Sequence, residues 1–151
     1  MKLALTVAVV AACGKDPPAT YTPTKIVPLA LPSLGLRFDA PDAAKIGTTE
    51  PTSVLVDWPG VKLAVRLRGD SLFEPDLGSA AATARAFAQI SKQESTSDGW
   101  ELRYEETLGG DTLYNVEIAR TIGGTEVQCK GAGNTSAAEA QLAAACASLR
   151  R

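Results

Sequence analysis

The sequence contains no histidine, and its acidic side chains outnumber its basic ones. Histidine is the most common general base and metal ligand, so its absence argues against triad-type hydrolases and most zinc sites. The chain carries 15 basic and 17 acidic side chains, a net charge of −2. Nucleic-acid binding needs a basic surface that neutralises phosphates, so no nucleic-acid partner is predicted. No metal and no other cofactor is predicted either, and the protein is not expected to be an enzyme.

The apolar run at the start of the chain, Leu3 to Val10, is too short to span a bilayer. It follows Met1-Lys2 and leads into Val10-Ala11-Ala12-Cys13. Small residues before a cleavage site suit a signal peptidase, and a cysteine directly after them resembles the bacterial lipobox. That resemblance implies that residues 1–12 are a signal peptide and that Cys13 is the acylated N-terminus of the mature protein.

The residues after Cys13 predict where the protein is held. In the lipoprotein pattern an aspartate after the cysteine favours the inner membrane, and the residue here is Gly14. The prediction is a lipid-anchored protein of the bacterial cell envelope, in the outer membrane and facing the periplasm. Residues 13–28 are rich in proline and threonine, which is typical of an extended, solvated tether. Residues 29–151 are then predicted to form a single α+β domain.

Cysteine is scarce, with three in the chain. If Cys13 is acylated, Cys129 and Cys146 remain as an even pair in an oxidising compartment, where disulfides persist. Cys129 shares the apolar side of a predicted strand with Val127, and Cys146 shares the apolar side of a predicted helix with Leu142. A disulfide between Cys129 and Cys146 is therefore predicted to join that helix to the sheet.

Alternating apolar and polar residues predict the fold. Six strands are expected at residues 34–38, 53–58, 61–68, 100–105, 112–121 and 126–130. Helices are expected over residues 80–92, with Ser79 as N-cap, and from Ser136 to about Leu149. The order is β-β-β-α-β-β-β-α. Because each strand has one polar face, both helices are predicted to pack on one face of a two-layer antiparallel sheet.

This order of elements resembles the PsbP-like fold. The residues that carry the resemblance are LGLRFDAP (34–41), the central helix and ASLR (147–150), and it covers residues 31–150. The resemblance implies binding and assembly rather than chemistry, and no catalytic motif comes with it. PsbP-like domains usually cover both faces of the sheet, whereas the pattern here predicts cover on one face.

Arginines suggest a partner surface. Arg66 and Arg68 are two residues apart on one predicted strand and so point the same way, and Arg103 joins them if its strand is adjacent. Arginine suits bidentate recognition of carboxylates. The alternative is that these arginines pair with Glu101, Glu105 or Glu117 across strands and only solvate the sheet.

Acidic and glycine-rich segments are weaker candidates for a site. The adjacent carboxylates of Glu105 and Glu106 point to opposite strand faces and cannot act on one bond. Asp70, Glu74 and Asp76 lack the spacing of a calcium loop, and residues 131–133 lack the lysine of a phosphate loop. No catalytic residue is predicted from these segments.

The predicted function is a membrane-anchored, non-catalytic module that binds an envelope protein or a cell-wall component. One alternative is a small-ligand or lipid carrier, with a cavity between the sheet and the alanine-rich helices. Another is a hydrolase whose acidic residues come together only on folding. A deep apolar pocket would favour the carrier, and a filled core with an exposed patch would favour the binding module.

Overall fold

The computed structural model describes residues 17–151, so the predicted signal peptide and Cys13 lie outside the described residues. The strands are β1 (Ile26–Leu31), β2 (Leu36–Pro41), β3 (Lys45–Thr49), β4 (Ser53–Trp58), β5 (Val61–Leu67), β6 (Gln89–Thr96), β7 (Gly99–Leu108), β8 (Asp111–Ile122) and β9 (Thr125–Gly133). The α-helices are α1 (Leu77–Arg85) and α2 (Ser136–Ala147). Among these residues, no helix is long and apolar enough to cross a membrane.

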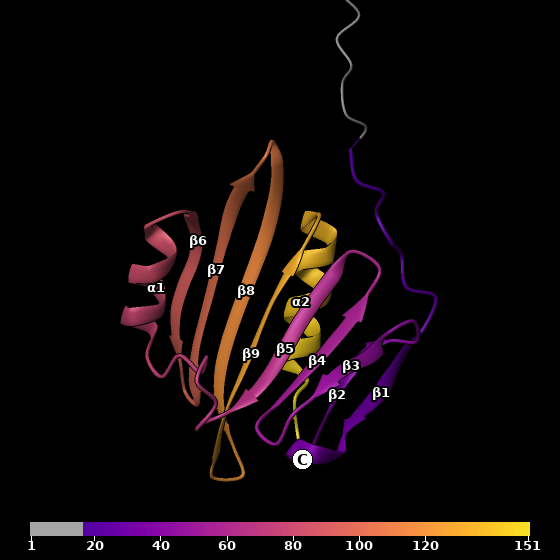
Figure 1. The fold of residues 1–151 in the computed structure, drawn as a ribbon, viewed down its shortest axis with the longest axis vertical. Coiled ribbons are helices and arrows are strands. Elements are labelled where there is room, and N and C mark those ends of the chain that lie inside the picture. Colours follow the sequence, from indigo (N-terminus) through magenta and orange to yellow (C-terminus); the bar gives the residue numbers. More distant parts are fainter. Residues whose placement is uncertain (1–16) are drawn as a thin grey trace, which may run out of the picture.

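Seven strands form one antiparallel sheet in the order β3-β4-β5-β9-β8-β7-β6, and β1 and β2 form a separate hairpin (Figure 1). The predicted hairpin of residues 53–58 and 61–68 is present as β4 and β5, joined at Pro59-Gly60. Gly60 has a φ of +82°, which a glycine adopts without strain. The α+β class and the antiparallel sheet are confirmed.

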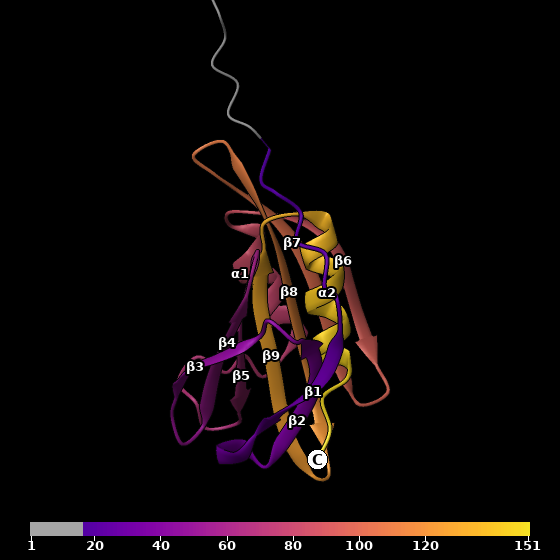
Figure 2. The ribbon, with the colours of Figure 1, turned by 90° about the vertical axis from the view of Figure 1, so that its right-hand side faces the viewer.

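The two helices lie on opposite faces of the sheet, so the prediction that both pack on one face is wrong (Figure 2). On β8, Ile118 packs in the cluster under α2, while its neighbour Ala119 packs in the cluster under α1. The apolar residues of β7, such as Trp100, are in register with Ala119 and not with Ile118. The apolar face therefore changes sides between β9 and β7.

The first helix is shorter than predicted, and a strand replaces its second half. Asp76, and not Ser79, is the N-cap of α1, because Asp76 Oδ1 accepts a hydrogen bond from Ser79 N at 2.8 Å. The helix ends at Arg85, and residues 89–92, predicted as helix, begin β6 and pair with β7. Backbone pairing with β7 outweighs the local helix propensity of residues 89–92, which contain no alanine.

Two strands before α1, β1 and β3, were not predicted. β1 begins at Ile26, so the expected boundary between tether and domain after residue 28 falls inside a strand. β3 is an edge strand with all five residues exposed, and it shows no apolar alternation. With β1, β3 and β6 added, five strands precede α1 and four follow it.

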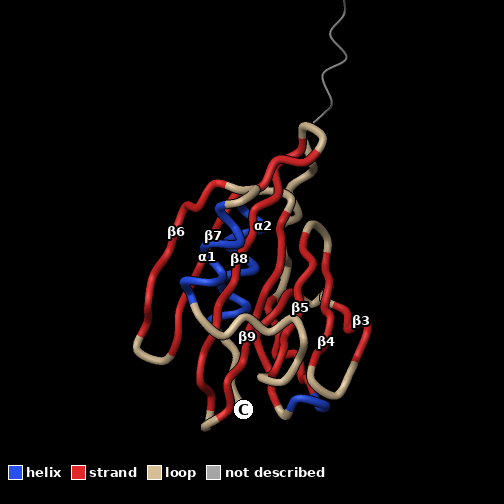
Figure 3. Tube along the Cα trace, turned by 60° about the vertical axis from the view of Figure 1, so that its left-hand side comes forward, coloured by secondary structure: helices blue, strands red, loops and turns tan. Residues whose placement is uncertain are grey.

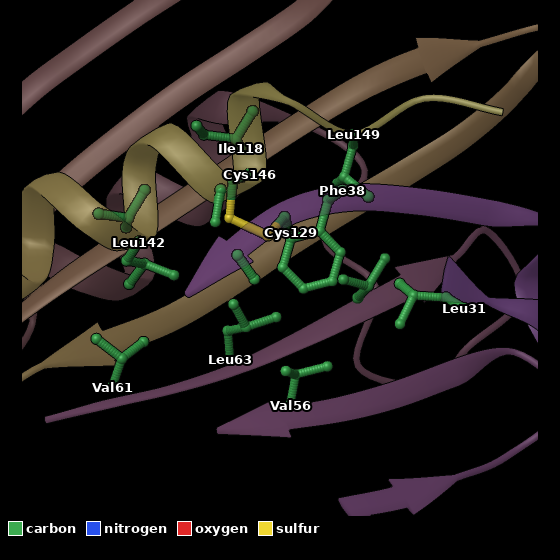
Figure 4. Close-up of a cluster of buried hydrophobic side chains, with 14 of the residues drawn as sticks. Leu31, Phe38, Val56, Val61, Leu63, Ile118, Cys129, Leu142, Cys146 and Leu149 are labelled. Carbon is green, nitrogen blue, oxygen red and sulfur yellow. A yellow bond between two sulfur atoms is a disulfide. The ribbon is translucent and has the colours of Figure 1, made fainter. Parts of the chain in front are cut away.

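The main core lies between α2, the β1–β2 hairpin and the sheet. Cys129 and Cys146 form a disulfide with 5.6 Å between their Cα atoms, which confirms the predicted pair. Figure 4 places this disulfide between α2 and the strands, beside Phe38 and Leu142. Phe38, Leu142 and both cysteines are 0% exposed, so side chains fill the space beneath α2.

Candidate functional site

One face of the sheet is open over β3, β4, β5 and β9. On this face α1 packs on β6 and β7 and reaches Ala119 of β8, and no helix of residues 17–151 packs over the remaining strands. Figure 3 shows the loop between β5 and α1 crossing the sheet instead. In that loop, the backbone N–H of Glu74 donates to Gln128 Oε1 at 3.0 Å. The loop therefore covers Gln128 of β9, whereas Leu55 and Asp57 of β4 and Lys62 of β5 are exposed.

An open hollow of about 400 Å³ lies on this uncovered face, and we call it the lysine groove. Leu55 and Ala64 form its apolar floor, and Asp57, Lys62 and Lys130 supply its charges. Strand register explains this grouping. Leu55 is opposite Ala64, which is opposite Lys130, and Asp57 is opposite Lys62. Neighbouring residues in such rows lie on one face of the sheet and within contact distance.

A buried carboxylate holds one of the two lysines. Glu117 is 3% exposed, and its Oε1 lies 2.6 Å from Lys130 Nζ. The Tyr104 hydroxyl donates to the same oxygen at 2.9 Å, and Gln128 Nε2 donates to Oε2 at 3.4 Å. A buried carboxylate is costly unless it is paired and hydrogen-bonded. Lys130, which is 41% exposed, is thus fixed at one end of the groove.

Burial and electrostatics act on Tyr104 as well. Burial, and then the charge and the hydrogen bond of Glu117, raise the pKa of the Tyr104 hydroxyl above its ordinary value. Tyr104 therefore stays protonated and serves as a hydrogen-bond donor to Glu117.

The three arginines proposed as one partner face are not together. Arg66 lies on the open face, where its Nε is 3.5 Å from Asp70 Oδ1, and its buried Nη1 has no hydrogen-bond partner among the described residues. Arg68 pairs with Glu126 at the end of β5. Arg103 lies on β7, separated from β5 by β9 and β8, and on the other face of the sheet. The joint arginine face is therefore a wrong prediction.

Arg103 instead belongs to an ion-pair network on the α2 side of β7. Its Nε is 2.6 Å from Glu101 Oε1, and its Nη1 is 3.8 Å from Glu139 in the first turn of α2. Burial would raise the pKa of the Glu101 carboxyl, but hydrogen bonds from Lys92 and Arg103 outweigh burial and lower it. Burial raises the pKa of Glu139 in spite of Arg103. The predicted ion pair between Arg103 and Glu101 is present, but it forms within β7 and not across strands.

The acidic loop residues have structural roles. Asp70 accepts hydrogen bonds from Thr52 Oγ1 at 3.2 Å and from the backbone N–H of Leu72 at 2.9 Å. Asp76 caps α1. Across residues 17–151, no group of three or more histidine, cysteine or acidic side chains is placed to hold a metal ion. These carboxylates organise the loop that crosses the sheet.

Sequence reasoning did not find the lysine groove or the network of Glu117, Tyr104 and Gln128. Lys62 and Lys130 had the pattern of ordinary solvated strand residues. Glu117 lies between Val116 and Ile118, so it too had the pattern of an exposed strand residue. Glu117 is buried by side chains of the neighbouring strands. The one sequence signal for this network is that Tyr104 of β7 and Gln128 of β9 lie on the same face of the sheet as Glu117.

Comparison with known proteins identifies the fold. No protein-family model and no curated protein sequence matches the chain. The solution structure of cyanobacterial PsbP (CyanoP) from Synechocystis sp. PCC 6803 is similar over 93% of this chain and 97% of that chain, with a TM-score of 0.55 and 10% identity. A crystal structure from Bacteroides thetaiotaomicron is similar over 81% of this chain and 47% of the other, with a TM-score of 0.46 and 10% identity. A protein of unknown function, PA94 from Pseudomonas aeruginosa, is similar over 74% of this chain and 85% of the other, with a TM-score of 0.41 and 12% identity. The domain thus has a PsbP-like fold, with both faces of its sheet partly covered.

Proposed function

We propose that this protein is a lipid-anchored protein of the bacterial cell envelope whose domain binds a partner through the lysine groove, without catalysis. The sequence Val10-Ala11-Ala12-Cys13 supports the anchor. The observation that carries the binding role is the groove itself, an open hollow in which the buried Glu117 fixes Lys130. Because Glu117 already restrains Lys130, this side chain loses less conformational entropy when a partner binds.

The filled core supports a binding module over a carrier. A carrier needs an enclosed cavity, and the space beneath α2 is occupied by Phe38, Leu142 and the disulfide. The groove, in contrast, is open to solvent, and the side chains of Lys62 and Lys130 are accessible there. The carboxylate of Glu101 forms an ion pair with Arg103, and that of Glu117 forms an ion pair with Lys130. These pairings give the hydrolase alternative no support.

The groove suits an acidic polypeptide segment of another envelope protein. Lys62 and Lys130 present two ammonium groups beside the apolar side chain of Leu55, which is 45% exposed. Such a surface accepts a carboxylate together with a neighbouring apolar side chain. Because Asp57 is opposite Lys62, the partner competes with that carboxylate, and binding is expected to weaken with salt.

A photo-crosslinking residue in place of Leu55 tests this proposal in intact cells. We expect a specific adduct with an envelope protein, lost when Lys62→Glu is added and kept with Lys25→Glu, the same charge change at an exposed position outside the groove. A crosslinker in place of Phe87, which is 50% exposed just after α1 and does not line the groove, serves as the positional control. The same adduct from position 87, or an adduct insensitive to Lys62→Glu, would refute the groove as the binding surface. Adducts with cell-wall peptide alone would refute the choice of a protein partner.

A further inference from the structure

The chain before β1 is docked on the domain. Tyr21 packs against the main core, and its backbone carbonyl accepts a hydrogen bond from Gln141 Nε2 of α2 at 2.9 Å. Nearer to β1, the backbone N–H of Asp42 donates to the carbonyl of Lys25 at 3.0 Å. Part of the segment predicted as a solvated tether over residues 13–28 therefore contacts the domain from Tyr21 onward, although Thr22, Thr24 and Lys25 are exposed.

This docked segment leads to one end of the domain. Pro17, Pro18 and Thr20 line an open hollow of about 700 Å³ together with residues 110–114 of the β7–β8 hairpin and residues 134–136 at the start of α2. In Figures 1 and 3, the described chain begins beside the tip of that hairpin. Four residue steps separate Pro17 from Cys13 and span at most about 14 Å when fully extended. An undocked chain from Cys13 to Ile26 would reach about 45 Å.

We propose that this end of the domain, with the tip of the β7–β8 hairpin at residues 107–111, lies against the lipid surface. The proposal rests on the lipid attachment of Cys13 in the proposed function. A lipid at Cys13 would hold Pro17 within reach of the headgroups, and the hairpin tip extends from the same end. Docking of residues 17–25 would then fix the orientation of the domain on the membrane.

The tip has the side chains for a shallow contact with lipid. Leu108 is 53% exposed at the end of β7 and is followed by Gly109 and Gly110, which take φ values of +58° and +86°. A leucine at such a turn adds nothing to the core, whereas it gains from contact with acyl chains. Glu106 precedes the tip and Asp111 lies within it, and carboxylates at these positions would limit the contact to the level of the headgroups.

This orientation determines where the groove opens. The strands of the sheet run toward the hairpin end, so the face that carries the lysine groove stands upright on the membrane (Figure 1). A partner in the groove then lies beside the domain, along the membrane surface, and not above it.

Depth-dependent fluorescence quenching tests the proposal on the full lipidated protein. Leu108→Cys and Thr121→Cys, an exposed position toward the other end of β8, each supply one accessible thiol for a fluorophore, because Cys129 and Cys146 are bonded and buried. The vesicles contain phosphatidylethanolamine, phosphatidylglycerol and a nitroxide-labelled phospholipid. We expect at least about twofold stronger quenching at position 108 than at position 121.

The outcomes separate the two proposals. Protein that floats with vesicles but shows equal quenching at both positions, or stronger quenching at position 121, would overturn the orientation and leave the anchor intact. Wild-type protein that does not float would overturn the lipid attachment and the orientation with it. A ten-residue Gly-Ser insertion between Gly14 and Lys15 should abolish the difference in quenching, and an unchanged difference would contradict the role of the short reach.

Discussion

The two halves of the sheet are covered on opposite faces, and by elements with different side chains. β4, β5 and β9 are covered on one face by α2 and the β1–β2 hairpin, with large side chains on both sides of the interface and a disulfide across it. β6 and β7 are covered on the other face by α1, whose buried residues are all alanines. There the large side chains, such as Trp100 and Tyr104, come from the sheet.

This difference indicates which half holds the domain together. The alanines of α1 allow close approach to the sheet, but a nine-residue helix buries little apolar area. Trp100 Nε1 is buried there without a hydrogen-bond partner in the described part of the chain. We therefore expect the half under α2 to set the global stability, and α1 with β6 to open locally at lower free energy.

Removal of the disulfide should have the largest effect. The bond closes a loop of 17 residues. Replacing Cys129 and Cys146 by alanine is expected to lower the free energy of unfolding by about 3 kcal/mol, because the unfolded chain gains conformational freedom. Urea unfolding of the wild type, with and without reductant, provides the control. A loss below about 1 kcal/mol would contradict the importance assigned to this half.

Loss of the lysine that neutralises Glu117 should have the next largest effect. Lys130→Met leaves a carboxylate that is 3% exposed without its cation. The expected cost is about 2 kcal/mol, less than for a fully buried pair because Lys130 is 41% exposed. Adding Glu117→Gln should restore part of this loss in urea unfolding. If the double variant is no more stable than Lys130→Met, the buried charge is not the cause.

Matched glycine substitutions in the two helices sharpen the comparison. Ala81→Gly in α1 and Ala143→Gly in α2 each remove a buried methyl group and should each cost about 1 kcal/mol of local helix stability. We expect Ala81→Gly to speed amide hydrogen exchange in α1 and β6 alone, and Ala143→Gly to lower the global free energy of unfolding. The same exchange pattern from both variants would show that the two halves unfold as one unit.

The smallest expected loss of stability concerns an ion pair that links the two halves of the sheet. Arg120 on β8 binds Asp98 between β6 and β7 at 2.9 Å and donates to the carbonyl of Ala147 at the end of α2 at 2.8 Å. The hydrogen bond from Arg120 lowers the pKa of the Asp98 carboxyl against the effect of burial. Because the folded-state pKa lies below the unfolded one, this contribution is present above the unfolded value near 4 and is lost as pH falls through the folded value.

Asp98→Asn should therefore lower stability by less than about 1 kcal/mol at pH 6, because the pair is partly exposed. Thermal unfolding at several pH values between 6 and 2.5 would measure the difference from the wild type. That difference should shrink toward the acid end, and a constant difference would exclude the Asp98 charge as its source.

Much of the fold follows from local pattern. The alternation in residues 53–58 and 61–68, with Pro59-Gly60 between them, is sufficient to predict the β4–β5 hairpin. The apolar faces of Cys129 and Cys146, together with the export signal, are sufficient to predict their disulfide. β6 was not predicted, because most of its residues are exposed and show no apolar alternation. It forms a strand because its backbone pairs with β7.

The sequence by itself determined which residues on each strand share a face, where the turns fall and which cysteines can meet. Tertiary structure alone decided which of those faces come together, because register between strands depends on contacts between distant parts of the chain. That register placed Trp100 beside Ala119 and so moved α1 to the face opposite α2. It also brought Lys130 opposite both Glu117 and Ala64, so that Lys130 pairs with a buried carboxylate at the edge of an open groove.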